Sequence, residues 1–291
     1  MAAPTFNNIP LEQVSSSQPP PPPGWDNYVP PPPEVTGCPP GLEYLLLVDQ
    51  LVAKQSAEPL TNYGDLNAKR RFVFANRRGQ KAFSCQEEEI TELCDCSDMG
   101  CFCCCLHQRR TFRVQDNSLR EAIRLVADFP PFSGCCWCAA LPRCAWSLRV
   151  EAPPGHLIGR VEQLRSCWRS RLRVLDAGGE ELFQLRGPNC GCACPALGCH
   201  NDVVFTLEAA KSPGEQVGEL RLLNSYAEEL MEEQDRSCLC RPSPQRASNP
   251  DKFRLTFPMG LDVKAKATLI GLLVLVDIMH FERDVPPEGS M

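Results

Sequence analysis

A strand, a short turn and a returning strand recur five times between residues 71 and 222, and this repetition constrains the fold more than any other feature of the chain. In the first copy, apolar residues over 71–74 and 81–83 flank a polar turn that ends at Gly79. The other copies pair 111–114 with 122–126, 146–150 with 158–164, 172–175 with 182–185 and 203–207 with 217–222. Successive hairpins form an antiparallel meander, and a long meander loses its exposed edges when it closes on itself. The pattern therefore predicts a closed β-barrel.

One apolar segment near the C-terminus, 263–281, is predicted to be a helix inside that barrel. Its uncharged run, 267–276, is ten residues long, whereas a membrane-spanning helix needs about 20 apolar residues. A helix that is hydrophobic all round must be enclosed by protein, and the barrel is the available enclosure. Insertion into a bilayer, with Lys264 and Lys266 reaching the interface, stays open as an alternative. His280 is expected to be structural, since a cation is favourable at the C-terminus of a helix.

Composition divides the chain into three parts. The first 40 residues hold 13 of the 28 prolines, so 1–38 is predicted to be a disordered proline-rich region. The domain is predicted over 39–283, with a further helical stripe at 42–52, and 284–291 is expected to be a disordered tail. The proline-rich region has two interpretations, a docking ligand for SH3 or WW modules and a flexible tether.

The charge balance and the motifs exclude several functions. Thirty-six acidic and 30 basic residues give a net charge of -6, which argues against strong nucleic-acid binding because such binders usually carry a basic excess. No G-x-S-x-G, H-E-x-x-H or G-x-x-x-x-G-K-[ST] motif is present. The four histidines have no recognisable catalytic partner pattern. Chemistry on covalent bonds is therefore not expected.

Nineteen cysteines are the other unusual count. The first 17 residues are polar and no secretory leader is expected, which places the cysteines in a reducing cytosol. There they are thiols, metal ligands or carriers of thioester-linked lipid. A zinc site is one hypothesis, although its spacing is loose for zinc; its candidate ligands are Cys190, Cys194, Cys199 and His200.

Four motifs resemble those of the phospholipid scramblases. They are Pro-Gly-Leu-Glu-Tyr at 40–44, Ala-Pro-Pro-Gly at 152–155, Gly-Pro at 187–188 ahead of a cysteine cluster, and Phe-Pro at 257–258 with Leu-Asp-Val-Lys-Ala-Lys-Ala at 261–267. The resemblance covers about 39–282 and includes the proline-rich N-terminus. It implies a mainly β, Tubby-like fold, a twelve-stranded closed antiparallel barrel around a central hydrophobic C-terminal helix.

The implied activity is ATP-independent, bidirectional and calcium-responsive movement of phospholipids between membrane leaflets. The implied partners are membrane phospholipids, and the implied location is the plasma membrane with the domain facing the cytosol. The alternative is a membrane-anchored, lipid-binding adaptor that transports nothing and recruits SH3 or WW proteins through its proline-rich region.

The resemblance also implies a calcium segment at 249–260. Compared with an EF-hand loop, it keeps oxygen-bearing side chains at positions 1 and 3 but has Phe253 at position 5 and Gly260 in place of the bidentate carboxylate at position 12. Weak Ca²⁺ binding, through Asn249, Asp251 and Asp262, is therefore expected. An ordinary turn before the buried helix is the alternative.

A cysteine-rich run before the Ala-Pro-Pro-Gly turn is the palmitoylated segment that the resemblance implies. The matching candidates here are Cys135, Cys136, Cys138 and Cys144. One acyl chain binds a membrane only marginally, so at least two acylated sites would be needed. A second candidate is the run at 101–105.

Three arginines alternate in the predicted strand near 172, which places Arg169, Arg171 and Arg173 on one face. Such a row can bind anionic lipid head groups with about 1 kcal/mol per charge near a membrane surface. The alternative is an ordinary solvated strand face.

Overall fold

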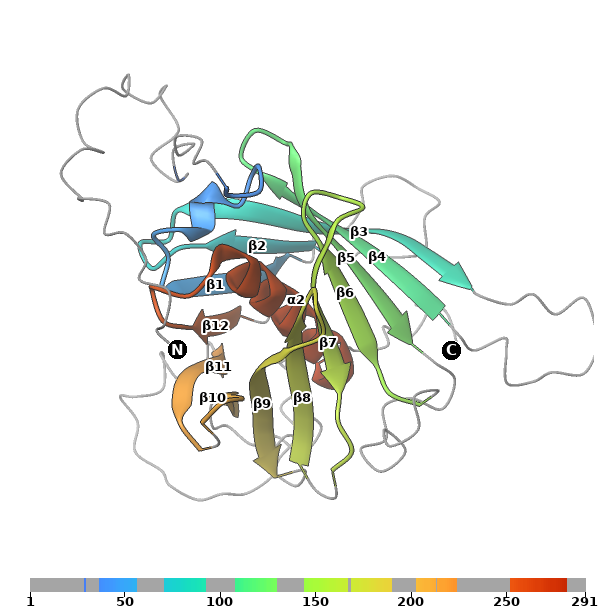
Figure 1. Ribbon diagram of the computed structural model, residues 1–291. Coiled ribbons are helices and arrows are strands. Elements are labelled where there is room, and N and C mark those ends of the chain that lie inside the picture. The colour runs from blue at the N-terminus through green and yellow to red at the C-terminus, as the bar shows by residue number, and fades with distance from the viewer. Residues whose placement is uncertain are drawn as a thin grey trace, which may run out of the picture.

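The computed structural model describes residues 29, 37–56, 71–92, 108–129, 144–166, 169–189, 203–212, 214–223 and 252–281. Twelve strands form a closed antiparallel barrel around one helix (Figure 1). Each strand pairs with the next one along the chain, and β12 closes the barrel by pairing with β1. The strands are β1 (Gln50–Ser56), β2 (Arg71–Ala75), β3 (Lys81–Glu92), β4 (Gln108–Asp116), β5 (Glu121–Phe129), β6 (Ser147–Glu151), β7 (Leu157–Gln163), β8 (Arg169–Asp176), β9 (Glu181–Asn189), β10 (Val203–Ala209), β11 (Gln216–Leu223) and β12 (Lys252–Thr256).

The five predicted hairpins are confirmed as the pairs β2/β3, β4/β5, β6/β7, β8/β9 and β10/β11. The predicted helix over 42–52 is wrong beyond its first turn, because a short 3-10 helix, η2 (Glu43–Leu45), is followed by β1. Leu51 and Ala53 alternate into the core, and β1 hydrogen-bonds to β2 and β12 at once. Closure of the barrel therefore overrides the local helical spacing, since a missing strand would leave two exposed edges.

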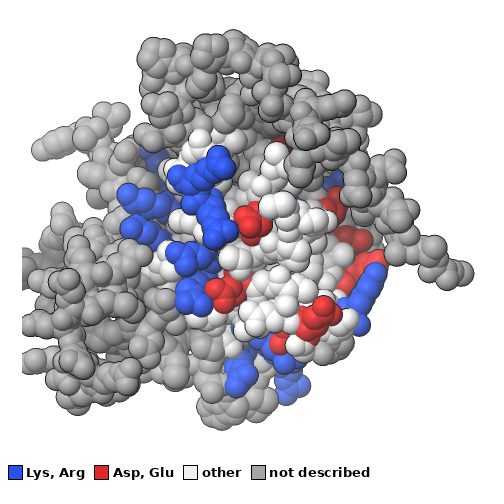
Figure 2. Space-filling view, turned by 90° about the vertical axis from the view of Figure 1, so that its left-hand side faces the viewer, with Lys and Arg blue, Asp and Glu red and all other residues white. Residues whose placement is uncertain are grey.

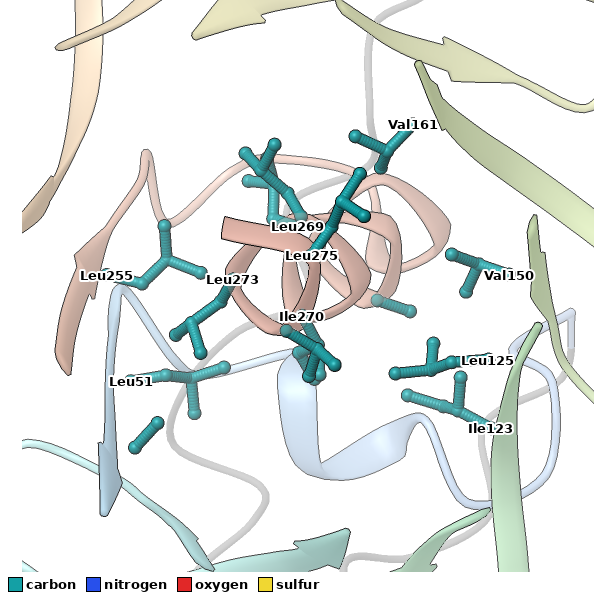
Figure 3. Close-up of a cluster of buried hydrophobic side chains, with 14 of the residues drawn as sticks. Leu51, Ile123, Leu125, Val150, Val161, Leu255, Leu269, Ile270, Leu273 and Leu275 are labelled. Atoms are coloured by element: carbon teal, nitrogen blue, oxygen red, sulfur yellow. The ribbon is translucent and has the colours of Figure 1, made fainter. Parts of the chain in front are cut away.

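Helix α2 (Val263–His280) fills the interior of the barrel, as predicted. Every residue over 265–278 is buried. Figure 3 shows strand residues around the helix, with Leu51 and Leu255 on one side and Leu125 and Val150 on the other. Across the described parts of the chain, no helix has both the length and the hydrophobicity that crossing a bilayer requires.

Two glycines allow α2 to lie close to the strands. A Cβ atom added to Gly271 would lie 2.7 Å from methyl carbons of both Leu148 and Val150 on β6. A Cβ atom on Gly159 of β7 would overlap the side chain of Thr268. The helix therefore packs on β6 and β7 through positions where a side chain of any size would push it away.

The antiparallel order gives the barrel two unlike ends. The turn end carries the turns between β2 and β3, β4 and β5, β6 and β7, β8 and β9, and β10 and β11, together with η2 and the segment from β12 into α2. The connection end carries the opposite ends of the strands. The connections from β1 to β2, from each hairpin to the next, and from β11 to β12 begin and end there. Helix α2 ends there, where Nε2 of His280 lies 2.9 Å from Oγ of Ser170 on β8.

At the turn end, a buried lysine fixes the start of α2. The side chain of Lys266 is fully buried, and its ammonium donates hydrogen bonds to backbone carbonyls of η2, the segment after it and the segment before α2. The acceptors are the oxygens of Leu45 at 2.9 Å, Leu46 at 3.3 Å, Val48 at 2.8 Å and Met259 at 2.7 Å. A buried ammonium needs such partners to offset the loss of its hydration.

Burial lowers the pKa of Lys266 to about 8, while the carboxylates of Asp49 and Asp262 act in the opposite direction. The side chain is therefore still protonated at pH 7. Lysine in the unfolded chain has its ordinary value of 10.5. As the pH rises above about 8, the native state releases this proton before the unfolded state does, and this linkage raises native stability until about pH 10.5.

We expect Lys266→Met to lower the free energy of unfolding by about 3 kcal/mol, because several buried carbonyls lose their charged donor. Urea unfolding followed by tryptophan fluorescence measures the change. Lys264→Met, two residues earlier and exposed, is the matched control and should be nearly neutral. The difference between wild type and Lys266→Met should widen from pH 8 to pH 10; a constant difference would contradict the assigned pKa.

We expect Gly271→Ala to destabilise the protein by about 1–2 kcal/mol, although alanine favours helices, because the added methyl group overpacks the contact with β6. Gly260→Ala is the matched control, since its Cβ atom would meet nothing within 4 Å and should be neutral or slightly stabilising. Thermal unfolding of both variants tests this, and equal melting temperatures would rule out the close helix packing.

Candidate functional site

The predicted arginine row lies on the outer face of β8. Ser170, Leu172 and Val174 point inward and are buried, so Arg169, Arg171 and Arg173 face outward as the alternation predicts.

The partners of two of these arginines differ. Arg173 forms an ion pair with Glu162 of β7, with Nη2 2.7 Å from Oε2. Arg171 donates a hydrogen bond of 2.8 Å to the neutral amide of Gln184 on β9. Arg173 is therefore partly neutralised, whereas no carboxylate among the described residues pairs with Arg171.

The predicted calcium segment contains a barrel strand. Asn249 and Asp251 lie outside the described residues, but the residues after them form β12. Phe253, at the fifth position of the compared loop, turns into the barrel, where its ring centroid lies 5.4 Å from that of Phe281. The fifth position therefore supplies packing to the core, where an EF-hand loop would supply a ligand to calcium.

The third calcium candidate, Asp262, lies at the other end of that strand. It is exposed and occupies the position before α2, and its side chain makes no hydrogen bond to cap the helix. A five-residue strand such as β12 spans about 17 Å. Asp262 is therefore at the turn end, whereas Lys252 begins β12 at the connection end.

The cysteine predictions fall mostly outside the described residues. This applies to Cys135, Cys136 and Cys138 of the acylation candidates and to all four zinc candidates, Cys190, Cys194, Cys199 and His200. Cys144 lies within the described residues, shortly before β6, and is a half-buried free thiol. Among the described residues, no group of three or more His, Cys, Asp or Glu side chains is arranged to hold a metal ion.

The strand ends that flank the cysteine-rich segments all lie at the connection end. Glu92 pairs with Gln108, which pairs with Phe129 on the next strand. Asp128 pairs with Ser147, where β6 begins. The acylation candidates between β5 and β6 therefore join the barrel at the end where α2 terminates.

Two other cysteines have thiols that burial keeps protonated. Burial raises the pKa of Cys85 well above its usual value, and Cys85 lies in the core. Burial also raises the pKa of Cys38 to about 11, with help from the nearby carboxylates of Glu43 and Asp262. Acylation and metal binding use the thiolate, so neither cysteine adds to the candidates.

His280 is neutral at pH 7, because burial lowers its pKa to about 4. It therefore stabilises the end of α2 through its contact with Ser170 and through the ring of Phe205, whose centroid lies 5.7 Å away. A structural part in the fold follows, but the cationic interaction with the helix C-terminus that the sequence suggests does not form.

Sequence reasoning missed the lysine that fixes α2 and the basic side chains of β12. For Lys266 the sequence suggests only that it could reach a membrane interface, because sequence alone does not show the carbonyl oxygens around it. The predicted calcium segment also contains Lys252 and Arg254, to which the calcium prediction gives no binding role. The alternation of Lys252, Phe253, Arg254 and Leu255 is a strand pattern, and it was the available signal for a basic outer surface.

Comparisons with known proteins give one consistent result. The scramblase family model matches residues 30–237. Phospholipid scramblase 1 of Homo sapiens is 29% identical over 245 residues, which are 84% of this chain and 67% of the relative. Phospholipid scramblase 2 of Homo sapiens is 30% identical over 246 residues, or 84% of this chain and 72% of the relative.

Phospholipid scramblase family member 5 of Homo sapiens is 28% identical over 248 residues, or 85% of this chain and 79% of the relative. No solved structure matches the chain. The family model covers well over half of the chain and reaches from before η2 to beyond β11. Together with the closed barrel around an apolar helix, this match shows that the chain belongs to the scramblase family.

Proposed function

We propose that this protein moves phospholipids between the two leaflets of a membrane in both directions, without ATP and in response to calcium. Membership of the scramblase family is the observation that supports this proposal. The activity needs no covalent chemistry, because the barrier is the transfer of a polar head group through hydrocarbon.

The packing of the barrel limits how such a protein can work. Helix α2 occupies the interior of the barrel. The side chains packed there, such as Leu125 of β5 and Leu273 of α2, are fully buried. Within the described residues, a head group therefore finds no open polar path along the barrel axis. We propose that lipid moves along the outer surface, where outward-facing residues such as Arg171 offer polar contacts in place of water.

We propose further that the protein resides at the plasma membrane with its domain in the cytosol, held by acyl chains on Cys135, Cys136, Cys138 and Cys144. These segments join the barrel at the connection end, which would bring that end toward the membrane. Two or more chains are required for a stable anchor.

The calcium response is proposed to be weak and to involve Asn249 and Asp251. Asp262 is left out of this group, because it follows β12 at the turn end. A site with few carboxylates falls in the millimolar range of affinity.

A second candidate function is a lipid-binding adaptor that transports nothing and recruits SH3 or WW proteins through the proline-rich region. The filled interior favours it, since a sealed barrel resembles a rigid scaffold more than a conduit. The two candidates share the membrane anchor and differ in lipid flux.

Reconstitution into proteoliposomes with a fluorescent phospholipid separates the two functions. An impermeant quencher added outside removes the fluorescence of the outer leaflet even when no lipid moves. Without nucleotide, we expect millimolar calcium to start the loss of the remaining, inner-leaflet half of the fluorescence. Asp251→Ala should abolish the calcium response, whereas Asp262→Asn, the matched control, should retain it. Flux that ignores calcium would remove the calcium site from the proposal, and vesicle binding without flux would establish the adaptor.

A further inference from the structure

A basic surface covers the outer side of β1, β12 and β11 near the connection end. Lys54, Lys252, Arg254 and Arg221 form this surface, which we call the basic face. Their neighbours along each strand, such as Ala53, Phe253 and Leu220, point inward and are buried, so the four basic side chains point outward. Figure 2 views this side of the barrel and shows lysine and arginine side chains gathered there, with few acidic ones between them.

The strand register places these charges directly against one another. Lys54 of β1 is opposite Lys252 of β12, and Arg254 of β12 is opposite Arg221 of β11. Like charges in directly opposite positions of an antiparallel pair repel and destabilise the sheet. Two such pairs share one strand, so the arrangement costs stability that other parts of the barrel must offset.

Within the described part of the chain, the repulsion is only partly relieved. Arg221 forms an ion pair with Glu219, with Nη2 3.2 Å from Oε1. Among the described residues, no carboxylate pairs with Lys54, Lys252 or Arg254. Nε of Arg254 is buried and donates no hydrogen bond to a described residue. An anionic partner would therefore find three cations whose charge the barrel itself does not neutralise.

The shape of the surface suits an extended partner. The charges lie on the convex exterior of three adjacent strands, about 10 Å across at the usual spacing between strands. No outward position of these strands in the described residues carries an aromatic ring, which argues against the base stacking that single-stranded nucleic acids use. A plane of anionic head groups meets such a surface without needing a pocket.

We propose that the basic face docks the barrel onto a bilayer that contains anionic lipids, and that it does so apart from the arginine row of β8. The choice of partner rests on the proposed function, which requires contact with phospholipids. The face lies near the connection end, so docking there brings the acylation candidates and the membrane together.

Vesicle binding by the full chain, produced without acyl chains, tests the proposal. The vesicles contain phosphatidylcholine with or without about 30% phosphatidylserine, an anionic lipid that gives the membrane a negative surface potential. EDTA removes calcium. We expect Lys54→Gln, Lys252→Gln and Arg254→Gln together to weaken binding to the anionic vesicles about tenfold or more. Raising the salt to about 1 M should remove binding by the wild type, since screening shortens the Debye length to about 3 Å.

The matched control removes the same number of lysines and arginines at the turn end. This control combines Arg77→Gln, Lys211→Gln and Lys264→Gln, at three positions that are exposed at the turn end. The combined substitutions should change vesicle binding less than about twofold, since the charges that they remove face away from the membrane. Thermal unfolding verifies that both triple variants are folded.

Equal losses in the two triple variants would show an effect of net charge and overturn the proposal. Equal binding to vesicles without phosphatidylserine would overturn it too, as would binding to duplex DNA through the same residues with none to vesicles. Lipid flux is measured separately. Flux by a protein whose vesicle binding does not depend on the basic face overturns this inference alone. Binding through the basic face without flux leaves the inference standing and removes only the transport function.

Discussion

In the described part of the chain, the inner faces of the strands and η2 enclose the apolar surface of α2. The remaining features of the barrel follow from that enclosure. The barrel has to be wide enough to hold a helix, and Gly271 and Gly159 bring helix and strands into direct contact. The one full charge at the start of the buried surface, Lys266, is held by carbonyl oxygens of η2 and of the segment before α2. This contact fixes how far the helix enters the barrel, because moving it would separate a buried ammonium from its acceptors.

Because α2 fills the interior, the surfaces that remain for binding are on the outside of the barrel. A lipid head group, a calcium ion or a partner protein can meet only the outer face or the two ends. Outward residues such as Arg171, Arg254 and Lys252 supply the charge there, whereas the acids Glu162 and Glu219 neutralise part of it. Transport by this protein would then depend on how the barrel is oriented against the membrane. The same requirement applies to an adaptor, which is why binding and flux must be measured separately.

The two ends of the barrel differ in structure and in the segments that they carry. The turn end combines short turns, η2 and the Lys266 contact, all of which favour rigidity. The connection end receives the segments with the acylation candidates and lies beside the basic face. Hydrophobic anchors and basic residues strengthen membrane binding together, because each supplies free energy that is marginal alone. The antiparallel order of the strands places them at one end, although their segments are far apart in the sequence.

The sequence by itself determined the five hairpins, the buried helix and the scramblase family, since alternation, glycine-containing turns and local motifs are all encoded over a few residues. It also placed Arg169, Arg171 and Arg173 on one face, because a strand has a period of two. Only the tertiary structure decided that 50–56 is a strand, that Phe253 belongs to the core, and that Asp262 stands away from Lys252. The basic face was likewise hidden, since Lys54 and Lys252 become neighbours only when β12 closes the barrel against β1. Local patterns fix periodicity, whereas closure, register and the partners of a buried charge depend on residues that are distant in the chain.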